Sequence, residues 1–221
     1  MANEGIGGNA MKFGKTLILA AGLLLAGCET VPSIPASAAD EAPPGSWRAT
    51  ATDADKARIR GWYRSWQAAL ADARAKGHGA EIAAEGVLLQ PLAALPGPEL
   101  PAGDYLCRTI KVGAKGRSAL GYIAYDWFRC RVTAKQLVSS LTKLSGSQRP
   151  VGTVFPDNLK RQIFLGTLEL GDETIPLNYG SDRMRDMAGL IERVGDNRWR
   201  LVLPAPAYES LLDVIELVPA G

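Results

Sequence analysis

From Gly103 to the C-terminus, apolar and polar residues alternate in short runs, and glycine, proline, aspartate or asparagine separates one run from the next. The clearest pair of runs covers residues 151–155 and 162–170, which a Pro-Asp-Asn turn joins. Alternation with a period of two is typical of β-strands that bury one face. The connections are too short for helical crossovers between parallel strands, so we expect an antiparallel sheet over residues 102–221.

The regular spacing of these runs predicts a mainly β fold with about eight to ten strands. A closed barrel leaves no unpaired strand edge, so we favour a lipocalin-like antiparallel barrel. A sandwich of two sheets is the alternative. Gly166 lies inside one of the runs and marks a place where two backbones can approach closely.

One long helix is predicted upstream, over residues 52–76, with Thr52 or Asp53 as its N-cap and Gly77 at its end. Its apolar residues recur at spacings of three and four and share one face: Ile59, Trp62, Trp66, Leu70 and Ala73. A helix of this length is marginal alone in water. We expect this amphipathic N-terminal helix to pack on the β domain; a platform of tryptophans for a ligand is the alternative. The helical segment and a proline-rich connector, residues 90–101, make up residues 47–101.

The first residues predict export. Lys12 and Lys15 precede the apolar stretch 16–26, which is too short to span a bilayer and is typical of a signal peptide over residues 1–27. Met11 is an alternative start. The sequence Leu-Ala-Gly-Cys that ends at Cys28 resembles the cleavage box of bacterial lipoproteins, which implies cleavage before Cys28 and its acylation. An ordinary signal peptide or a membrane anchor is the alternative.

The lipoprotein interpretation places the protein in the bacterial cell envelope, facing the periplasm, with the outer membrane favoured over the inner. The membrane is then one partner, through acylated Cys28. Residues 28–46 are rich in proline, alanine and serine and predict a flexible tether. Cys107 and Cys130 remain as an even pair in an oxidising compartment, which predicts a disulfide; two reduced thiols are the alternative.

A family resemblance follows from five runs: GDYLCRTIKVG at 103–113, FRCRV at 128–132, GSQRPVGTVFPD at 146–157, FLGTLELGDE at 164–173 and RWRLVLPAP at 198–206. Together they resemble a bacterial envelope lipoprotein family known as domain of unknown function 4893. The resemblance covers roughly Trp47 to the C-terminus. It implies an envelope location and no particular activity, so it assigns no catalytic residue.

Several functional classes are disfavoured by what the sequence lacks. His78 is the sole histidine, which rules out a histidine-rich zinc site and forces any Ser-His-Asp triad to use it. Neither a P-loop nor a dinucleotide-binding glycine motif is present. The formal charge of +2 lacks the basic excess of a nucleic-acid binder. We therefore expect no metal, no cofactor and no nucleic-acid partner.

Carboxylates and arginines are the remaining candidates for a site. Strands from any part of a barrel could bring acids together, and the candidates by position are Asp182, Asp186, Glu209 and Asp213. Arginine suits bidentate binding of carboxylate or phosphate, and the candidate anion-binding residues are Arg149, Arg183 and Arg185. Placement on solvated strand faces is the simpler interpretation of both groups.

The absence of catalytic motifs favours a non-catalytic binding or structural module, whose partner is an envelope protein or a small ligand. The alternative is a carboxylate-dependent enzyme that acts on an envelope polymer. The sequence assigns no catalytic residue to either.

Overall fold

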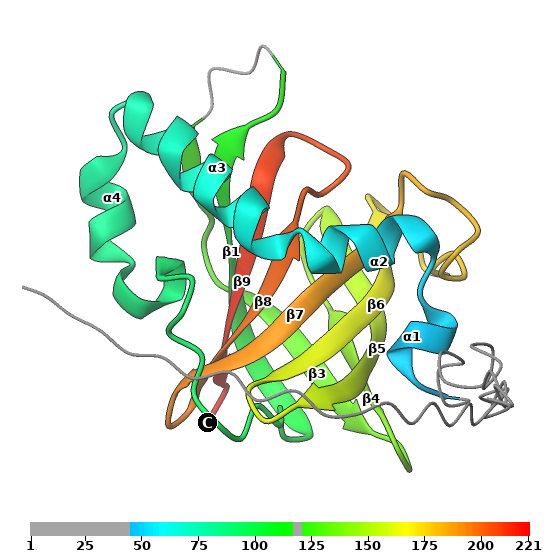
Figure 1. The fold of residues 1–221 in the computed structure, drawn as a ribbon. Coiled ribbons are helices and arrows are strands. Elements are labelled where there is room, and N and C mark those ends of the chain that lie inside the picture. Colours follow the sequence, from blue (N-terminus) through cyan, green and yellow to red (C-terminus); the bar gives the residue numbers. More distant parts are fainter. Residues whose placement is uncertain (1–44, 117–120) are drawn as a thin grey trace, which may run out of the picture. The chain divides into compact units, whose positions relative to one another are not determined.

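The computed structural model describes residues 45–116 and 121–221 (Figure 1). The expected signal peptide, the lipidated Cys28 and nearly all of the tether lie outside the described residues. Within the described part of the chain, no helix combines the length and apolarity that crossing a membrane requires.

Nine strands make up the sheet in the described part of the chain: β1 (Gly103–Ala114), β2 (Tyr122–Ala124), β3 (Phe128–Ala134), β4 (Ser139–Lys143), β5 (Gln148–Asn158), β6 (Arg161–Leu170), β7 (Asp186–Gly195), β8 (Arg198–Pro204) and β9 (Ser210–Pro219). Every pairing is antiparallel, and β9 returns to pair with β1. β1 and β3 to β9 thus form a closed ring of eight strands. The predicted antiparallel barrel is confirmed, and the sandwich is excluded.

β2 is an extra strand made possible by the length of β1. The first half of β1, from Gly103 to Cys107, pairs with β3, and its second half, from Ile110 to Val112, pairs with β2. Along its other edge β1 pairs with β9. One edge of β1 therefore carries two short strands in succession.

Both faces of much of the barrel wall are buried. Alternate residues such as Cys107, Phe164 and Leu201 form an apolar cluster inside the barrel. Their neighbours along the strands, such as Ile110, Val202 and Val214, join a second cluster with the helices on the outside. The region therefore has two cores, and the barrel wall separates them.

The helices cover one side of the barrel: α1 (Trp47–Thr50), α2 (Asp53–Arg60), α3 (Trp62–Ala75), α4 (Gly79–Ala84) and the 3₁₀ turn η1 (Gly86–Leu89). α3 crosses β1, β9 and β8, and α2 lies against β7 (Figure 1). Trp66 is 0% exposed, so the predicted docking of the helix is confirmed. The prediction of one continuous helix is wrong, because the helix is interrupted at Gly61. Gly61 caps the end of α2 and the start of α3 with φ −85° and ψ 3°, and glycine is a poor residue for a helix interior.

A buried arginine fixes the helical segment to the barrel. Arg200 of β8 is 0% exposed and pairs with Glu192 of β7, which is also 0% exposed. Its guanidinium lies 4.6 Å from the Trp66 ring centroid. It also donates to the carbonyl oxygens of Val87 and Leu88 in η1. The last carbonyl groups of a helical turn have no partner within the turn, and the N–H groups of this guanidinium supply one where they are buried.

Candidate functional site

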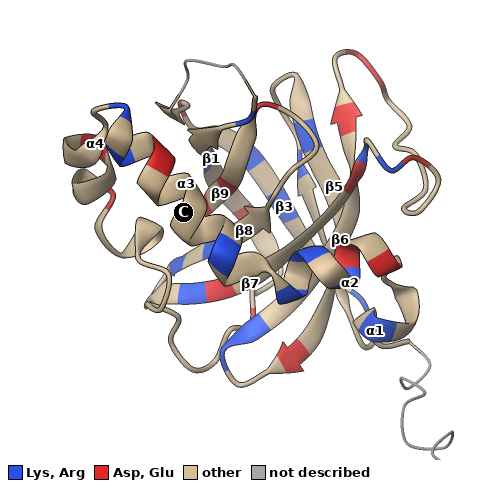
Figure 2. Cartoon of the chain, turned by 45° about the horizontal axis from the view of Figure 1, so that its top comes forward, with Lys and Arg blue, Asp and Glu red and all other residues tan. Residues whose placement is uncertain are grey.

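The two ends of the barrel differ. At one end the connector packs against the interior: Leu100 belongs to the interior cluster, and the Trp199 indole donates to the carbonyl oxygen of Glu99. At the other end, where β1, β6 and β8 terminate, the β6–β7 loop (171–185) and the β8–β9 loop (205–209) surround a cavity. We call this space the mouth cavity. Figure 2, which brings the top of the Figure 1 view forward, shows basic and acidic positions close together on α2 and on the strands behind it.

The mouth cavity is small. Its volume is about 40 Å³, and one water needs about 10–15 Å³ by this measure. Drug-sized ligands occupy pockets of roughly 300–1,000 Å³, so side chains already fill most of the barrel. Apolar walls come from residues that include Leu168, Met187, Leu203 and Ile215.

A lysine lies among the polar groups of the cavity. Lys111 of β1 points inward, and its Nζ lies 3.1 Å from Asp213 Oδ2 and 3.3 Å from Glu209 Oε2. Asp213 also accepts a hydrogen bond from the Ser210 hydroxyl. Burial by itself lowers the pKa of Lys111, but Asp213 and Glu209 outweigh burial and leave that pKa raised. Lys111 therefore remains a cation inside the barrel.

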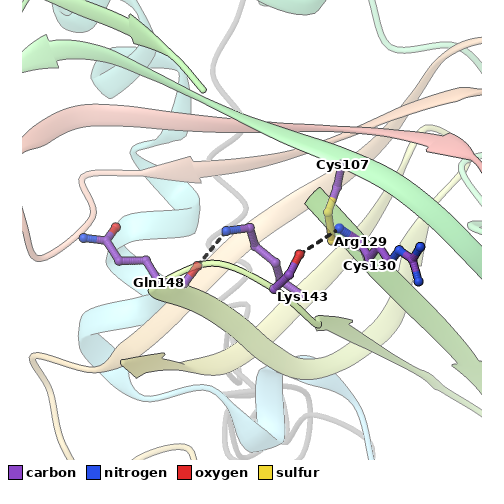
Figure 3. Close-up of a disulfide and its surroundings, with 6 residues drawn as sticks. Cys107, Arg129, Cys130, Lys143 and Gln148 are labelled. Atoms are coloured by element: carbon purple, nitrogen blue, oxygen red, sulfur yellow. Dashed lines mark hydrogen bonds between the residues drawn. A yellow bond between two sulfur atoms is a disulfide. The ribbon is translucent and has the colours of Figure 1, made fainter. Parts of the chain in front are cut away.

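The interior below holds the disulfide and a second lysine. Cys107 and Cys130 are joined, with 5.9 Å between their Cα atoms, so the predicted disulfide is confirmed. Lys143 is the cross-strand neighbour of Cys130 and extends toward the backbone of Gln148, to which it donates at 2.9 Å (Figure 3). Its Nζ lies 3.8 Å from the centroid of the Phe128 ring.

Lys143 has no carboxylate partner among the described residues. Burial lowers the pKa of Lys143 to about 8, and the charges of Arg149 and Lys111 contribute to this shift. The barrel interior therefore contains a cation that is close to losing its proton under mildly alkaline conditions.

A second depression adjoins the mouth cavity on the side of α2, with a volume of about 440 Å³. We call it the rim pocket. It shares Arg58, Met184, Asp186 and Ala207 with the cavity. The two spaces are therefore adjacent, and together they make up the candidate site.

Two buried carboxylates lie in the rim pocket. Asp55 is 1% exposed and accepts hydrogen bonds from the Tyr179 hydroxyl at 2.6 Å and the Thr52 hydroxyl at 3.1 Å. Its other oxygen has no hydrogen bond but lies 3.2 Å from Arg58 Nη1. Asp186 is 4% exposed; burial raises its pKa, and the charge of Asp55 raises it further. The pocket therefore holds an acid that retains its proton to higher pH than an ordinary aspartate does.

The β8–β9 loop that borders both spaces is strained. Ala205 has φ +47° and Glu209 has φ +62°, and within the described ranges they are the non-glycine residues with positive φ. Such a conformation costs about 1–3 kcal/mol per residue and persists only where the surroundings enforce it. Lys115 holds the loop, because its backbone N–H donates to the carbonyl oxygen of Glu209 and its ammonium donates to that of Pro206. Strain of this kind is concentrated at functional sites.

The structure brings three of the four predicted acids to this site. Asp213 lines the mouth cavity, Glu209 contacts the cavity residue Lys111 from the loop, and Asp186 borders both spaces. Asp182 lies in the β6–β7 loop and accepts from the backbone of Met184.

The three predicted arginines have different surroundings. Arg149 donates to Glu169 and to the carbonyl oxygens of Gly146, Gly171 and Glu173. Arg185 forms a bidentate pair with Glu173. Arg183 is exposed and lines the rim pocket. Two of the three guanidiniums thus hold the loops around the mouth, and the third faces the pocket.

Five charged residues in and around the candidate site were not singled out by the sequence: Asp55, Arg58, Lys111, Lys115 and Lys143. A signal existed for Lys111, because it shares the register of Tyr105 and Cys107 on β1 and must point inward with them. The others had no comparable signal. His78 lies before α4 and pairs with Glu81, away from the residues that line either space. Among the described residues, no cluster of three or more candidate ligands could hold a metal.

Comparison with known proteins identifies a family but no activity. The model of a family described as a domain of unknown function (DUF4893) matches residues 47–217. The match extends over the helices, the connector and nearly all of the barrel. No curated protein and no solved structure matches the chain.

Proposed function

The chain belongs to the DUF4893 family, and we propose that it is a lipid-anchored envelope protein, facing the periplasm, whose barrel mouth binds a small ligand without catalysing a reaction. The observation that carries the binding proposal is the position of the two strained residues. Ala205 and Glu209 both lie in the loop that borders the mouth cavity and the rim pocket. Such strain costs free energy, and it is concentrated at sites that use it to hold groups in place.

The size and chemistry of the site limit the ligand. The mouth cavity combines apolar walls with a few convergent charged groups, which is the usual composition of a small-molecule site. Its volume excludes a large lipid from the barrel interior. A small polar ligand, or one end of a longer molecule, fits this description better than a bulky hydrophobic ligand does.

The anchor is proposed from the N-terminal sequence alone, because Leu-Ala-Gly-Cys at Cys28 follows a basic and then an apolar stretch. Acyl chains contribute about 0.8 kcal/mol per buried CH₂, so more than one chain holds a protein on a membrane without basic residues. Changing Cys28 to Ala and fractionating cells tests this step. The parent should sediment with the outer membrane and the variant should not. Retention of the variant in membranes would show that acylation is not the anchor.

Ligand binding is tested by NMR titration with a panel of small carboxylates, amines and sugars. Binding at the mouth predicts shifts of the amide signals of the β6–β7 and β8–β9 loops, with no change at the β7–β8 turn at the other end. Shifts confined to other surfaces would place binding elsewhere and would contradict the proposal.

An enzyme that acts on an envelope polymer is the second candidate, and one observation favours it. Asp55 and Asp186 share the rim pocket, and the pKa of Asp186 is raised by burial. A pair of acids in different environments is the usual basis of acid–base catalysis by carboxylates. Incubation with purified cell-wall polymer, followed by mass spectrometry of released fragments, tests this candidate. Release by the parent and its loss in a folded Asp186→Asn variant would favour the enzyme over the binding module.

A further inference from the structure

Glu209 occupies an unusual position at the mouth cavity. It extends from a backbone with φ +62° to within 3.3 Å of the ammonium of Lys111. The Glu209 side chain is 56% exposed, whereas that of Lys111 is only 7% exposed. A carboxylate from the solvent side of the protein therefore lies over a cation inside it.

The two carboxylates that contact Lys111 differ in how firmly they are held. Asp213 has a side chain that is 9% exposed, and it accepts from the Ser210 hydroxyl. Glu209 has a mostly exposed side chain, so its carboxylate is already largely hydrated and regains water readily when it leaves Lys111. Glu209 can therefore leave Lys111 more easily than Asp213 can.

We propose that Lys111 binds the carboxylate of a small ligand, and that Glu209 occupies the place of that carboxylate in the free protein and leaves when the ligand enters. This inference rests on the proposed binding function of the barrel mouth and names the class of its ligand. To replace the ligand in this way, Glu209 must hold its carboxylate over the buried ammonium of Lys111, and the strained loop places it there.

The charge balance favours a monoanion. The cavity is lined by the cations Arg58, Lys111 and Arg185 and by the acids Asp186 and Asp213, and Glu209 adds one further negative charge next to Lys111. A ligand with one carboxylate replaces that charge without changing the total. A dianion such as phosphate would add a charge next to the buried Asp213, which is unfavourable where water does not screen it.

The rest of the cavity favours a short apolar chain next to the carboxylate. Leu168, Met187, Leu203 and Ile215 line the space beyond Lys111. Its volume of about 40 Å³ is enough for a few water-sized groups. Short-chain carboxylates, from acetate to hexanoate, are therefore the appropriate probes.

The experiment measures the affinity of the full chain for acetate, butyrate and hexanoate by calorimetry at constant ionic strength. Affinity should rise roughly fourfold for each methylene that the cavity buries, and then level off. The change Glu209→Gln removes the competing anion but keeps the shape of the side chain. It should tighten binding about two- to fivefold, because the ligand no longer has to displace a partly exposed carboxylate from Lys111.

Two further variants complete the design. Asp196→Asn is the matched control, because it removes the same charge from a fully exposed side chain in the β7–β8 turn. It should leave the affinity unchanged. Lys111→Met should abolish binding of the carboxylates, and its melting curve shows whether it has folded. Glu209→Gln removes no buried charge, so its result decides the proposal even if Lys111→Met fails to fold.

The outcomes separate this inference from the proposed function. If carboxylates bind equally well to the parent and to Glu209→Gln, Glu209 does not compete and the inference is overturned, while binding at the mouth stands. If no carboxylate binds but amines or sugars perturb the mouth loops, the ligand class is overturned alone. If no probe of any class perturbs the mouth, the inference and the proposed function both fail.

Discussion

Changing Trp66 to Ala should remove the largest single contribution to the docking of the helices. The ring is 0% exposed, and its Nε1 donates to the carbonyl oxygen of Leu89 at 3.3 Å. The Arg200 guanidinium lies over the Trp66 ring, 4.6 Å from its centroid. The variant therefore loses apolar burial, a hydrogen bond and a cation–π contact together.

The magnitude follows from the buried area. A tryptophan buries about 150–250 Å², which at about 25 cal/mol per Å² corresponds to roughly 4–6 kcal/mol. The denatured chain already buries part of this area, so the figure is an upper value. We expect Trp66→Ala to lower the free energy of unfolding by about 3–5 kcal/mol, as aromatic-to-alanine changes in cores do.

The same helix supplies the controls. Tyr63 is 39% exposed and its ring meets the Trp62 ring edge-on at 5.4 Å between centroids, so Tyr63→Ala should lower the free energy of unfolding by only about 0.5–1 kcal/mol. Trp62 is half-buried and has the Arg161 guanidinium 4.0 Å from its ring centroid. An intermediate loss of about 1–2 kcal/mol is expected for Trp62→Ala.

Urea denaturation followed by far-UV circular dichroism measures all three variants, because removing a tryptophan would alter a fluorescence signal directly. The order of stability should be Tyr63→Ala, then Trp62→Ala, then Trp66→Ala. If the free energies of unfolding of Trp66→Ala and Tyr63→Ala differ by less than about 1 kcal/mol, the Trp66 contact does not hold α3 and the docking argument is refuted.

Three further predictions concern the barrel. Burial lowers the pKa of Lys143 from 10.5 to about 8 on folding. Between about pH 8 and pH 10.5 only the unfolded chain keeps this proton, so the free energy of unfolding of the parent should rise by up to roughly 3 kcal/mol relative to that of Lys143→Met over this range. Denaturation of both proteins at several pH values checks this, and parallel pH profiles would show that Lys143 is not buried as a cation. Replacing Cys107 and Cys130 together by alanine should lower the free energy of unfolding by about 3 kcal/mol, because the bridge joins residues that are 23 positions apart in sequence. An unchanged denaturation midpoint would contradict this. Gly166→Ala places a Cβ 2.3 Å from a backbone carbonyl oxygen and should lower the free energy of unfolding by about 1–3 kcal/mol. Gly79→Ala is the control, because a Cβ there meets open space, and its free energy of unfolding should stay within about 0.5 kcal/mol of the parent. Equal stability of the two variants would refute the close approach at Gly166.

Local sequence patterns were sufficient to predict the helical segment, the strands and one long-range contact, the disulfide. Alternation along the chain placed Cys107 and Cys130 on strand faces, and their pairing in an exported protein followed from their number. The apolar stripe with Trp66 correctly predicted a buried helix face. Gly166 was correctly assigned to a close approach of two backbones, because it lies opposite Gly152 of β5.

The same patterns misplaced a charged residue of the outer wall. Arg108 and Arg129 alternate with apolar residues on their strands, and solvent was the simplest environment for both; Arg129 is exposed as expected, but Arg108 is not. The helices cover part of that wall, so Arg108 is half-buried and pairs with Glu85 and Glu216. A strand pattern distinguishes two faces, but it does not say which of them a distant helix will cover.

The candidate site depended entirely on tertiary structure. Closure of the ring brings Lys111 of β1 beside Asp213 of β9, which are 102 residues apart. Docking of α2 then brings Asp55 and Arg58 to the rim beside Asp186. The sequence alone determined that short alternating strands would form a barrel with a helix against it, because periodicity is a local property of the chain. Which charges face water, pair with one another or line a cavity was decided by ring closure and helix docking, because electrostatic environment depends on neighbours that are remote in sequence.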